Sequence, residues 1–313
     1  MCRIEIMELL DVVGKLVKEG KALEALEEVK KVAPEDVKRV ADVMFKKPEE
    51  IKSLDGVWRA ILTLIYLSYT SMYYVKRNDN RSLVNCVISS TYAVKICNEL
   101  GIAEPVPMLL RNAARALTLM GMTDRAEKMY QEAERIAVND PLEFAAVEND
   151  YATLLYGLKR YEEALDKIEE ALRIRISLGS DEVLAETLVN AAEIYRKVGN
   201  YPMVDKCFRE ALTIYKNLIR ERESFKFDLA ITLSNFGLFC KGRHQYSRAE
   251  KLLKESLEIF EELEKVDKGF SQFTALTLRY IGDLYKEMGR FDDANEYYRK
   301  SKKKFVGSIP LGD

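Results

Sequence analysis

Histidine, glycine and proline are scarce in this chain of 313 residues, which has one histidine, 15 glycines and 7 prolines. A single imidazole, with no closely spaced cysteine pair beside it, leaves almost no route to histidine-based catalysis or to a zinc site. So few glycines and prolines are a poor supply for the many turns of an all-β fold. The formal net charge of −2 provides no basic field for nucleic acid or an anionic membrane.

Long hydrophobic runs are also absent. The longest uncharged run, residues 60–75, contains several hydroxyl side chains and is too short for a membrane span, so it predicts a buried helix. Residues 1–20 carry acids early, which predicts an amphipathic helix and not a signal peptide. The five cysteines are scattered, and Cys86 and Cys97 would lie about 16 Å apart on one helix, too far for a disulfide. We therefore expect free thiols and a cytoplasmic protein.

Residues 105–304 repeat one pattern in five in-register copies, each an apolar-periodic helix, a turn and a second apolar-periodic helix. The turns are Gly121-Met122-Thr123, Lys159-Arg160-Tyr161, Gly199-Asn200-Tyr201, His244-Gln245-Tyr246 and Gly289-Arg290-Phe291. Each first helix has a small residue in the same register: Ala114, Ala152, Ala192, Gly237 and Gly282. A large residue of the second helix follows each of them at a constant spacing: Tyr130, Ile168, Phe208, Leu253 and Tyr298. Two helices cross closely only where side chains are small, so each copy predicts one crossing with a large side chain packed beside it.

This pattern resembles the tetratricopeptide repeat. Successive copies lie 38 to 45 residues apart, against the usual 34, which is similar to the extended repeats of kinesin light chains. The resemblance implies an all-α fold, an α-solenoid in which antiparallel helix pairs form a right-handed superhelix. We expect an N-terminal helical cap in residues 1–55, a divergent helical repeat in 56–104, and five extended repeats with a C-terminal capping tail in 105–313.

The first hundred residues are less regular than the rest. Helices are predicted at residues 9–18, 22–32, 57–76 and 83–100. Gly20 separates the first two helices, Asp55 is the expected cap of the third, and Gly101 follows the fourth.

No catalytic, cofactor or metal site is predicted. His244 lies in a turn, where an exposed imidazole is far commoner than a catalytic one. Residues 14–21 lack the spacing, the hydroxyl and the preceding strand of a phosphate loop. Three tyrosines in residues 66–73 share one helical face, which core packing explains better than base stacking. The basic run in residues 299–304 suits the end of a last helix better than an electrostatic docking tail.

Asparagine recurs two residues before the small residue of the first helices. The positions are Asn112, Asp150, Asn190 and Asn235, with Tyr280 in the last copy. The resemblance implies that these helices line a concave face that contacts extended peptides. There an asparagine offers one acceptor and two donors to a peptide backbone, although bonds between repeats or to water would also explain the pattern. The expected cations of this face are Arg111, Arg115, Arg196, Lys197, Lys241, Arg279 and Lys286, against five acids.

The sequence therefore predicts a non-enzymatic, cytoplasmic scaffold or adaptor that binds a segment of another protein, or a peptide, without a cofactor. The slight excess of cations on the concave face would suit an acidic segment. Two alternatives stay open: a ligand- or peptide-gated regulatory sensor, and an RNA-binding helical repeat protein, which the acidic balance disfavours. No membrane partner is predicted, and self-association through an uncapped end stays open.

Overall fold

The computed structural model describes residues 3–54, 56–77, 79–179 and 181–307. Within these ranges every regular element is an α-helix or a short 3-10 helix (η), and no strand occurs, so the all-α fold class is confirmed. In the same ranges no helix has both the length and the apolar character needed to cross a bilayer. The chain divides into two compact units, which we call unit 1 (Met1–Ile174) and unit 2 (Arg175–Asp313).

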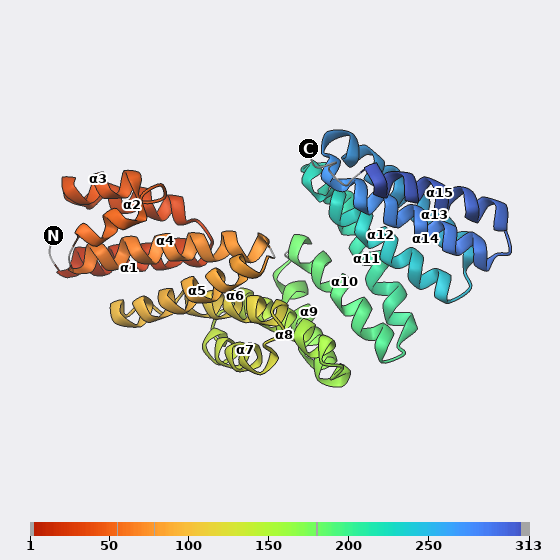
Figure 1. Cartoon of the computed structure of the whole chain (residues 1–313). Helices are drawn as coiled ribbons and strands as arrows, with labels where there is room; N and C mark the ends of the chain where they lie inside the picture. The colour runs from red at the N-terminus through yellow and green to blue at the C-terminus, as the bar shows by residue number, and fades with distance from the viewer. Residues whose placement is uncertain (1–2, 55, 78, 180, 308–313) are drawn as a thin grey trace. The chain divides into compact units, whose positions relative to one another are not determined.

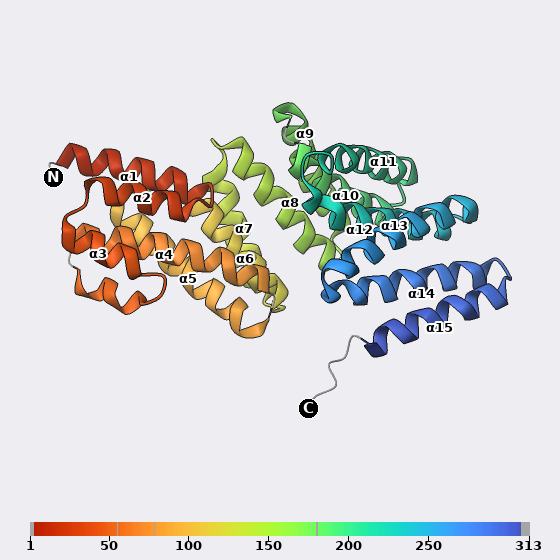
Figure 2. The ribbon, with the colours of Figure 1, turned by 90° about the horizontal axis from the view of Figure 1, so that it is seen from above.

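Unit 1 consists of consecutive helices joined by short turns (Figures 1 and 2). They are α1 (Arg3–Lys18), α2 (Ala22–Val32), α3 (Glu35–Val43), η1 (Pro48–Ser53), α4 (Gly56–Arg77), α5 (Asn80–Leu100), α6 (Val106–Leu119), α7 (Thr123–Ala137), α8 (Pro141–Gly157) and the first part of α9 (Tyr161–Leu178). The predicted helix pair around Gly20 is present as α1 and α2. Asp79 caps α5 by accepting a hydrogen bond from the Ser82 amide (2.9 Å), and Gly101 ends it with φ 71°. Asp55, the cap expected for α4, lies outside the described residues.

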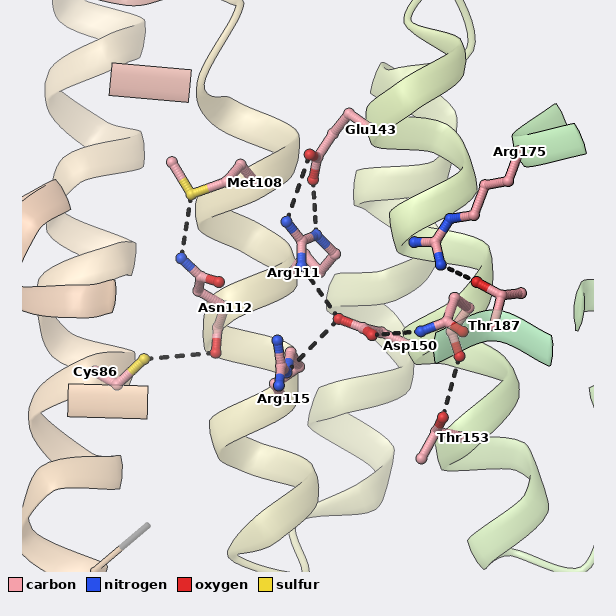
Figure 3. Close-up of polar contacts among 11 residues, drawn as sticks. Cys86, Met108, Arg111, Asn112, Arg115, Glu143, Asp150, Thr153, Arg175 and Thr187 are labelled. Atoms are coloured by element: carbon pink, nitrogen blue, oxygen red, sulfur yellow. Dashed lines mark hydrogen bonds and ion pairs between the residues drawn. The ribbon is translucent and has the colours of Figure 1, made fainter. Parts of the chain in front are cut away.

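Unit 2 holds the end of α9 and three further helix pairs. Their elements are α10 (Asp181–Lys197), α11 (Tyr201–Leu218), η2 (Glu223–Phe225), α12 (Lys226–Gly242), α13 (Tyr246–Val266), η3 (Lys268–Phe270), α14 (Ser271–Glu287) and α15 (Phe291–Gly307). The two helices of each pair pack along one another: α10 on α11, α12 on α13, and α14 on α15. The buried Arg175 side chain donates to the Thr187 hydroxyl and so ties α9 to α10 (Figure 3).

Small residues stand where the helices of a pair cross, as predicted. Ala114, Ala152 and Ala192 are completely buried. An ideal Cβ on Gly237 would come within 2.8 Å of Leu253 Cγ, and one on Gly282 within 2.7 Å of Tyr298 Cε1. These distances are too short for a real Cβ, so the large residue that the repeat places beside each crossing is what limits the size of the small one.

The turn inside each helix pair contains one residue in the left-handed region. These residues are Gly121 (φ 73°), Lys159 (φ 63°), Gly199 (φ 79°), His244 (φ 57°) and Gly289 (φ 76°). Glycine adopts this conformation without steric cost, whereas a residue with a Cβ is strained there. The five turns therefore share one geometry although two of them lack glycine.

Candidate functional site

Four predicted peptide-binding residues lie in unit 1, three on α6 and Asp150 on α8 (Figure 3). Asn112 is only 5% exposed. Its side-chain amide donates to Met108 Sδ (3.1 Å), and its backbone carbonyl accepts from Cys86 Sγ (3.5 Å). The asparagine therefore contributes to the packing of α6 against α5 and has little of its amide to offer a ligand.

Arg111 and Arg115 form ion pairs across the α6–α8 interface (Figure 3). Arg111 Nε donates to Glu143 Oε1 (2.8 Å), and its Nη1 donates to Asp150 Oδ2 (3.3 Å). Arg115 Nε lies 3.6 Å from the same Asp150 oxygen. Although burial opposes its charge, the carboxylates of Glu143 and Asp150 raise the pKa of Arg111 above its ordinary value. The charged groups of Arg111, Arg115, Glu143 and Asp150 are thus already paired with one another.

A shallow cleft of about 320 Å³ opens beside these residues in unit 1. It is lined by Lys18, Glu19, Gly20, Met72, Met108, Arg111, Asn112 and Arg115. Lys18, at the end of α1, pairs with Asp140, which also caps α8 by accepting from the Glu143 amide. Every cation that lines this cleft thus has a carboxylate partner within the chain, so the cleft presents no uncompensated positive charge.

The other predicted residues lie in unit 2 and have different surroundings. Asn190, on α10, is half-buried. Arg196 donates to Glu193 one turn earlier (2.7 Å). Lys241 pairs with Glu287 of α14 (2.9 Å). Arg279 and Lys286, both on α14, are exposed.

Asn235 lines a cleft of unit 2, which has a volume of about 550 Å³ and lies between α10 and α12. The lining residues are Glu193, Arg196, Tyr201, Asn235, Leu238, Phe239, Gly242 and Arg243. Among the described residues the Asn235 side-chain amide has no hydrogen-bond partner, although the residue is half-buried. The cleft therefore combines apolar walls with an amide that can both donate and accept.

Three residues that the sequence pattern did not single out shape one end of this cleft. The Arg243 guanidinium carbon lies 4.4 Å from the centre of the Tyr201 ring, in a cation–π stack. The Tyr201 ring in turn lies 6.2 Å from that of Phe239. Arg243 follows the last residue of α12, outside the helical register that predicts the cations of the concave face. The signal in the sequence that points to Arg243 is its position next to the turn of this helix pair.

Nucleophilic and metal chemistry have little support in the described part of the chain. His244 is exposed, with Nδ1 2.8 Å from the Tyr246 hydroxyl. The cysteines described are buried and free: Cys86, Cys97, Cys207 and Cys240. Burial raises the pKa of Cys86 to about 11 and that of Cys97 to about 12, which disfavours the reactive thiolate. No group of histidine, cysteine and acidic side chains suited to a metal occurs within the described ranges.

Comparisons with known proteins agree with the repeat geometry. A tetratricopeptide repeat model matches residues 143–217 and 228–303, which hold α8 to α11 and α12 to α15. The chain is a tetratricopeptide repeat protein. No curated protein sequence matches this tetratricopeptide repeat protein.

Solved structures with the same fold cover most of this tetratricopeptide repeat protein. BtubC (BKLC) from P. vanneervenii is 20% identical, with a TM-score of 0.65 over 74% of this chain and 94% of its own. The apo form of RapI is 17% identical, with a TM-score of 0.58 over 97% of this chain and 99% of its own. A Rap protein complexed with Competence and Sporulation Factor is 15% identical, with a TM-score of 0.53 over 97% and 99%. At such identities the similarity shows the fold.

Proposed function

We propose that this protein is a non-enzymatic, cytoplasmic scaffold or adaptor, which binds an extended segment of a partner protein in the α10–α12 cleft of unit 2. The observation that carries the proposal is Asn235, a half-buried residue in the wall of the cleft whose side-chain amide has no hydrogen-bond partner among the described residues. Such an amide can pair its two donors and its acceptor with the backbone of a bound segment.

The lining of the cleft supports a peptide as the ligand. An extended backbone offers the alternating amides and carbonyls that one asparagine side chain can pair with at once. Leu238 and Phe239 provide apolar surface on α12 for a side chain of the segment. The sequence pattern placed Asn190 and Arg196 on the same inner helix surface, and Arg196 lines the cleft. The other predicted residues of unit 2, Asn190 included, keep their peptide-binding role as part of the proposal, whereas the role of those in unit 1 stays a prediction.

The proposal is tested by peptide selection followed by substitution. Peptides are selected on the full chain from a random phage library, and the affinity of the best one is measured by isothermal titration calorimetry. Asn235→Ala should weaken it by about three- to tenfold, from the loss of about 1 kcal/mol of hydrogen bonding. Because alanine is a better helix former than asparagine, the variant should stay folded.

Asn217→Ala is the matched control, since Asn217 is an exposed residue in the last turn of α11. It should leave the affinity unchanged. Failure to select any peptide would contradict peptide binding, whereas equal affinity of wild type and Asn235→Ala would contradict the choice of this cleft.

A peptide-gated regulator is the second candidate. It is favoured by the fold shared with a Rap protein that was solved in complex with Competence and Sporulation Factor. Gating predicts that the selected peptide changes the conformation of the chain as well as binding to it. Small-angle scattering that shows compaction on adding the peptide would favour a regulator, and an unchanged scattering curve would favour a passive scaffold.

A further inference from the structure

The arginines in the turns of this protein differ in whether carboxylates lie beside them. Arg160 donates to Glu127 (2.7 Å) and to Glu163 (2.6 Å). Arg290 donates to Asp293 (2.7 Å) and lies 3.9 Å from Glu250. Each of these two guanidinium groups therefore has two carboxylates within the chain.

Arg243 has none among the described residues. Its only partner there is the Tyr201 ring, at 4.4 Å. The comparison with Arg290 is close, because that guanidinium also stacks on a tyrosine, Tyr285, at 4.2 Å. The two guanidinium groups lie at similar distances from their rings and differ in the acids that surround them. The N–H donors of a guanidinium lie in its own plane and point outward. A guanidinium stacked on a ring can therefore still donate two of them to one carboxylate.

The rest of the α10–α12 cleft does not cancel this charge. Glu193 is the only acid among its lining residues, and it accepts hydrogen bonds from Arg196 on the same helix (3.0 and 2.7 Å). Lys241, one residue before the end of α12, is matched by Glu287. Among the described residues the cleft thus has one cation without a counter-ion, the exposed Arg243, with the apolar side chains of Leu238 and Phe239 in the same lining.

We infer that the cleft recognises a carboxylate next to a large apolar side chain of the bound segment, and that Arg243, held on Tyr201, receives the carboxylate. The inference rests on the proposed function and adds the chemistry of the partner to it. The apolar side chain packs on Leu238 and Phe239, while Asn235 pairs with the backbone between the two groups. The carboxylate comes from an aspartate or glutamate side chain or from the end of a chain, since both present the same pair of oxygens.

The experiment uses synthetic hexapeptide pools and the full chain. Each pool has one fixed leucine and one fixed neighbour, which is aspartate, glutamate, asparagine or glutamine, and each is made with a free and with an amidated C-terminus. Fluorescence anisotropy of the labelled pools should give about tenfold tighter binding for an acid than for its amide, as expected for one charge-assisted hydrogen-bonded pair. Raising the salt concentration should reduce that ratio.

Variants assign the preference to the stacked arginine. Arg243→Gln should reduce the ratio of acid to amide affinity to about one. Tyr201→Leu should do the same, while Tyr201→Phe keeps the ring and the preference. Arg220→Gln removes an equal charge from an exposed site of unit 2 that forms no ion pair with any described residue, so it should leave the ratio unchanged.

The possible results separate this inference from the function on which it rests. Binding of no pool by the wild type would overturn both. Equal binding of acid and amide pools, together with equal binding of free and amidated ends, would overturn the carboxylate and leave peptide binding intact. A preference that survives in Arg243→Gln would overturn the role of Arg243. A preference seen only between free and amidated ends would support the inference with a chain terminus as the source.

Discussion

Two left-handed turn residues with side chains offer a direct test of how the repeats are stabilised. Lys159 and His244 occupy the position that glycine holds in the other three turns, with φ of 63° and 57°. A residue with a Cβ is strained in this conformation by about 1–2 kcal/mol. Glycine avoids that cost but loses about 0.5–1 kcal/mol more conformational entropy on folding. Lys159→Gly should therefore increase the free energy of unfolding of unit 1 by about 0.5–1 kcal/mol.

His244→Gly should stabilise unit 2 by less, because the substitution also removes the contact between His244 Nδ1 and the Tyr246 hydroxyl (2.8 Å). The reverse change provides the control. Gly199 has φ 79°, and an ideal Cβ there would have no atom within 4 Å, so Gly199→Ala measures the cost of the backbone alone. That cost should be about 1 kcal/mol.

The assay is urea unfolding followed by circular dichroism, with calorimetry to separate the two units if they unfold apart. A gain of 1 kcal/mol corresponds to about 2–4 °C in Tm for a protein of 150–250 residues. If Lys159→Gly lowered the stability while Gly199→Ala also lowered it, the lysine side chain would be stabilising the turn, and the argument from backbone strain would be refuted.

Two further predictions concern buried groups. Burial raises the pKa of Glu148 to about 7, in spite of Lys167 at 3.3 Å, so the folded state keeps a proton that the unfolded state loses between about pH 4.5 and 7. The free energy of unfolding should therefore fall as the pH rises through that window, by at most about 3 kcal/mol. Urea unfolding at pH 5 and pH 8 should show a smaller fall for Glu148→Gln than for the wild type. Gly282→Ala should destabilise unit 2 by about 1 kcal/mol, because overpacking against Tyr298 outweighs the gain in helix propensity. Gly157→Ala is the control: an added Cβ has open space there, so the variant should be more stable than the wild type. Thermal unfolding should show Tm falling in the first variant and rising in the second.

The helix pairs could be predicted because their determinants repeat within the sequence. A small residue and its large neighbour recur with constant spacing, and both belong to the same pair of helices, so no distant contact has to be known. Two helix ends of the first hundred residues were predictable for a similar reason, because Gly20 and Gly101 act on the chain within a few residues of themselves. The starts were less predictable: α1 and α5 begin before the predicted residues 9 and 83. The division into a cap, a divergent repeat and five extended repeats stays a prediction.

The surroundings of the recurring asparagines could not be predicted from their register alone. Asn112 and Asn235 hold the same position in their repeats, but the residue four earlier on the same helix differs. Met108 places a sulfur acceptor beside the Asn112 amide, whereas Ile231 offers no acceptor to Asn235. The first asparagine is thereby bonded and buried, and the second remains available in a cleft.

Recognition in a repeat protein depends on what its repeats do not share. Periodicity describes the surfaces that repeats use to pack on one another, and those surfaces must be alike. A ligand site needs a charge or an amide that packing leaves unmatched, and such a group is a departure from the pattern. Arg290 and Arg243 each lie over a tyrosine ring at a similar distance, yet among the described residues only Arg290 has acids beside it. Arg243, whose charge has no counter-ion among the described residues, is therefore a better guide to the partner of this protein than the residues that recur in every copy.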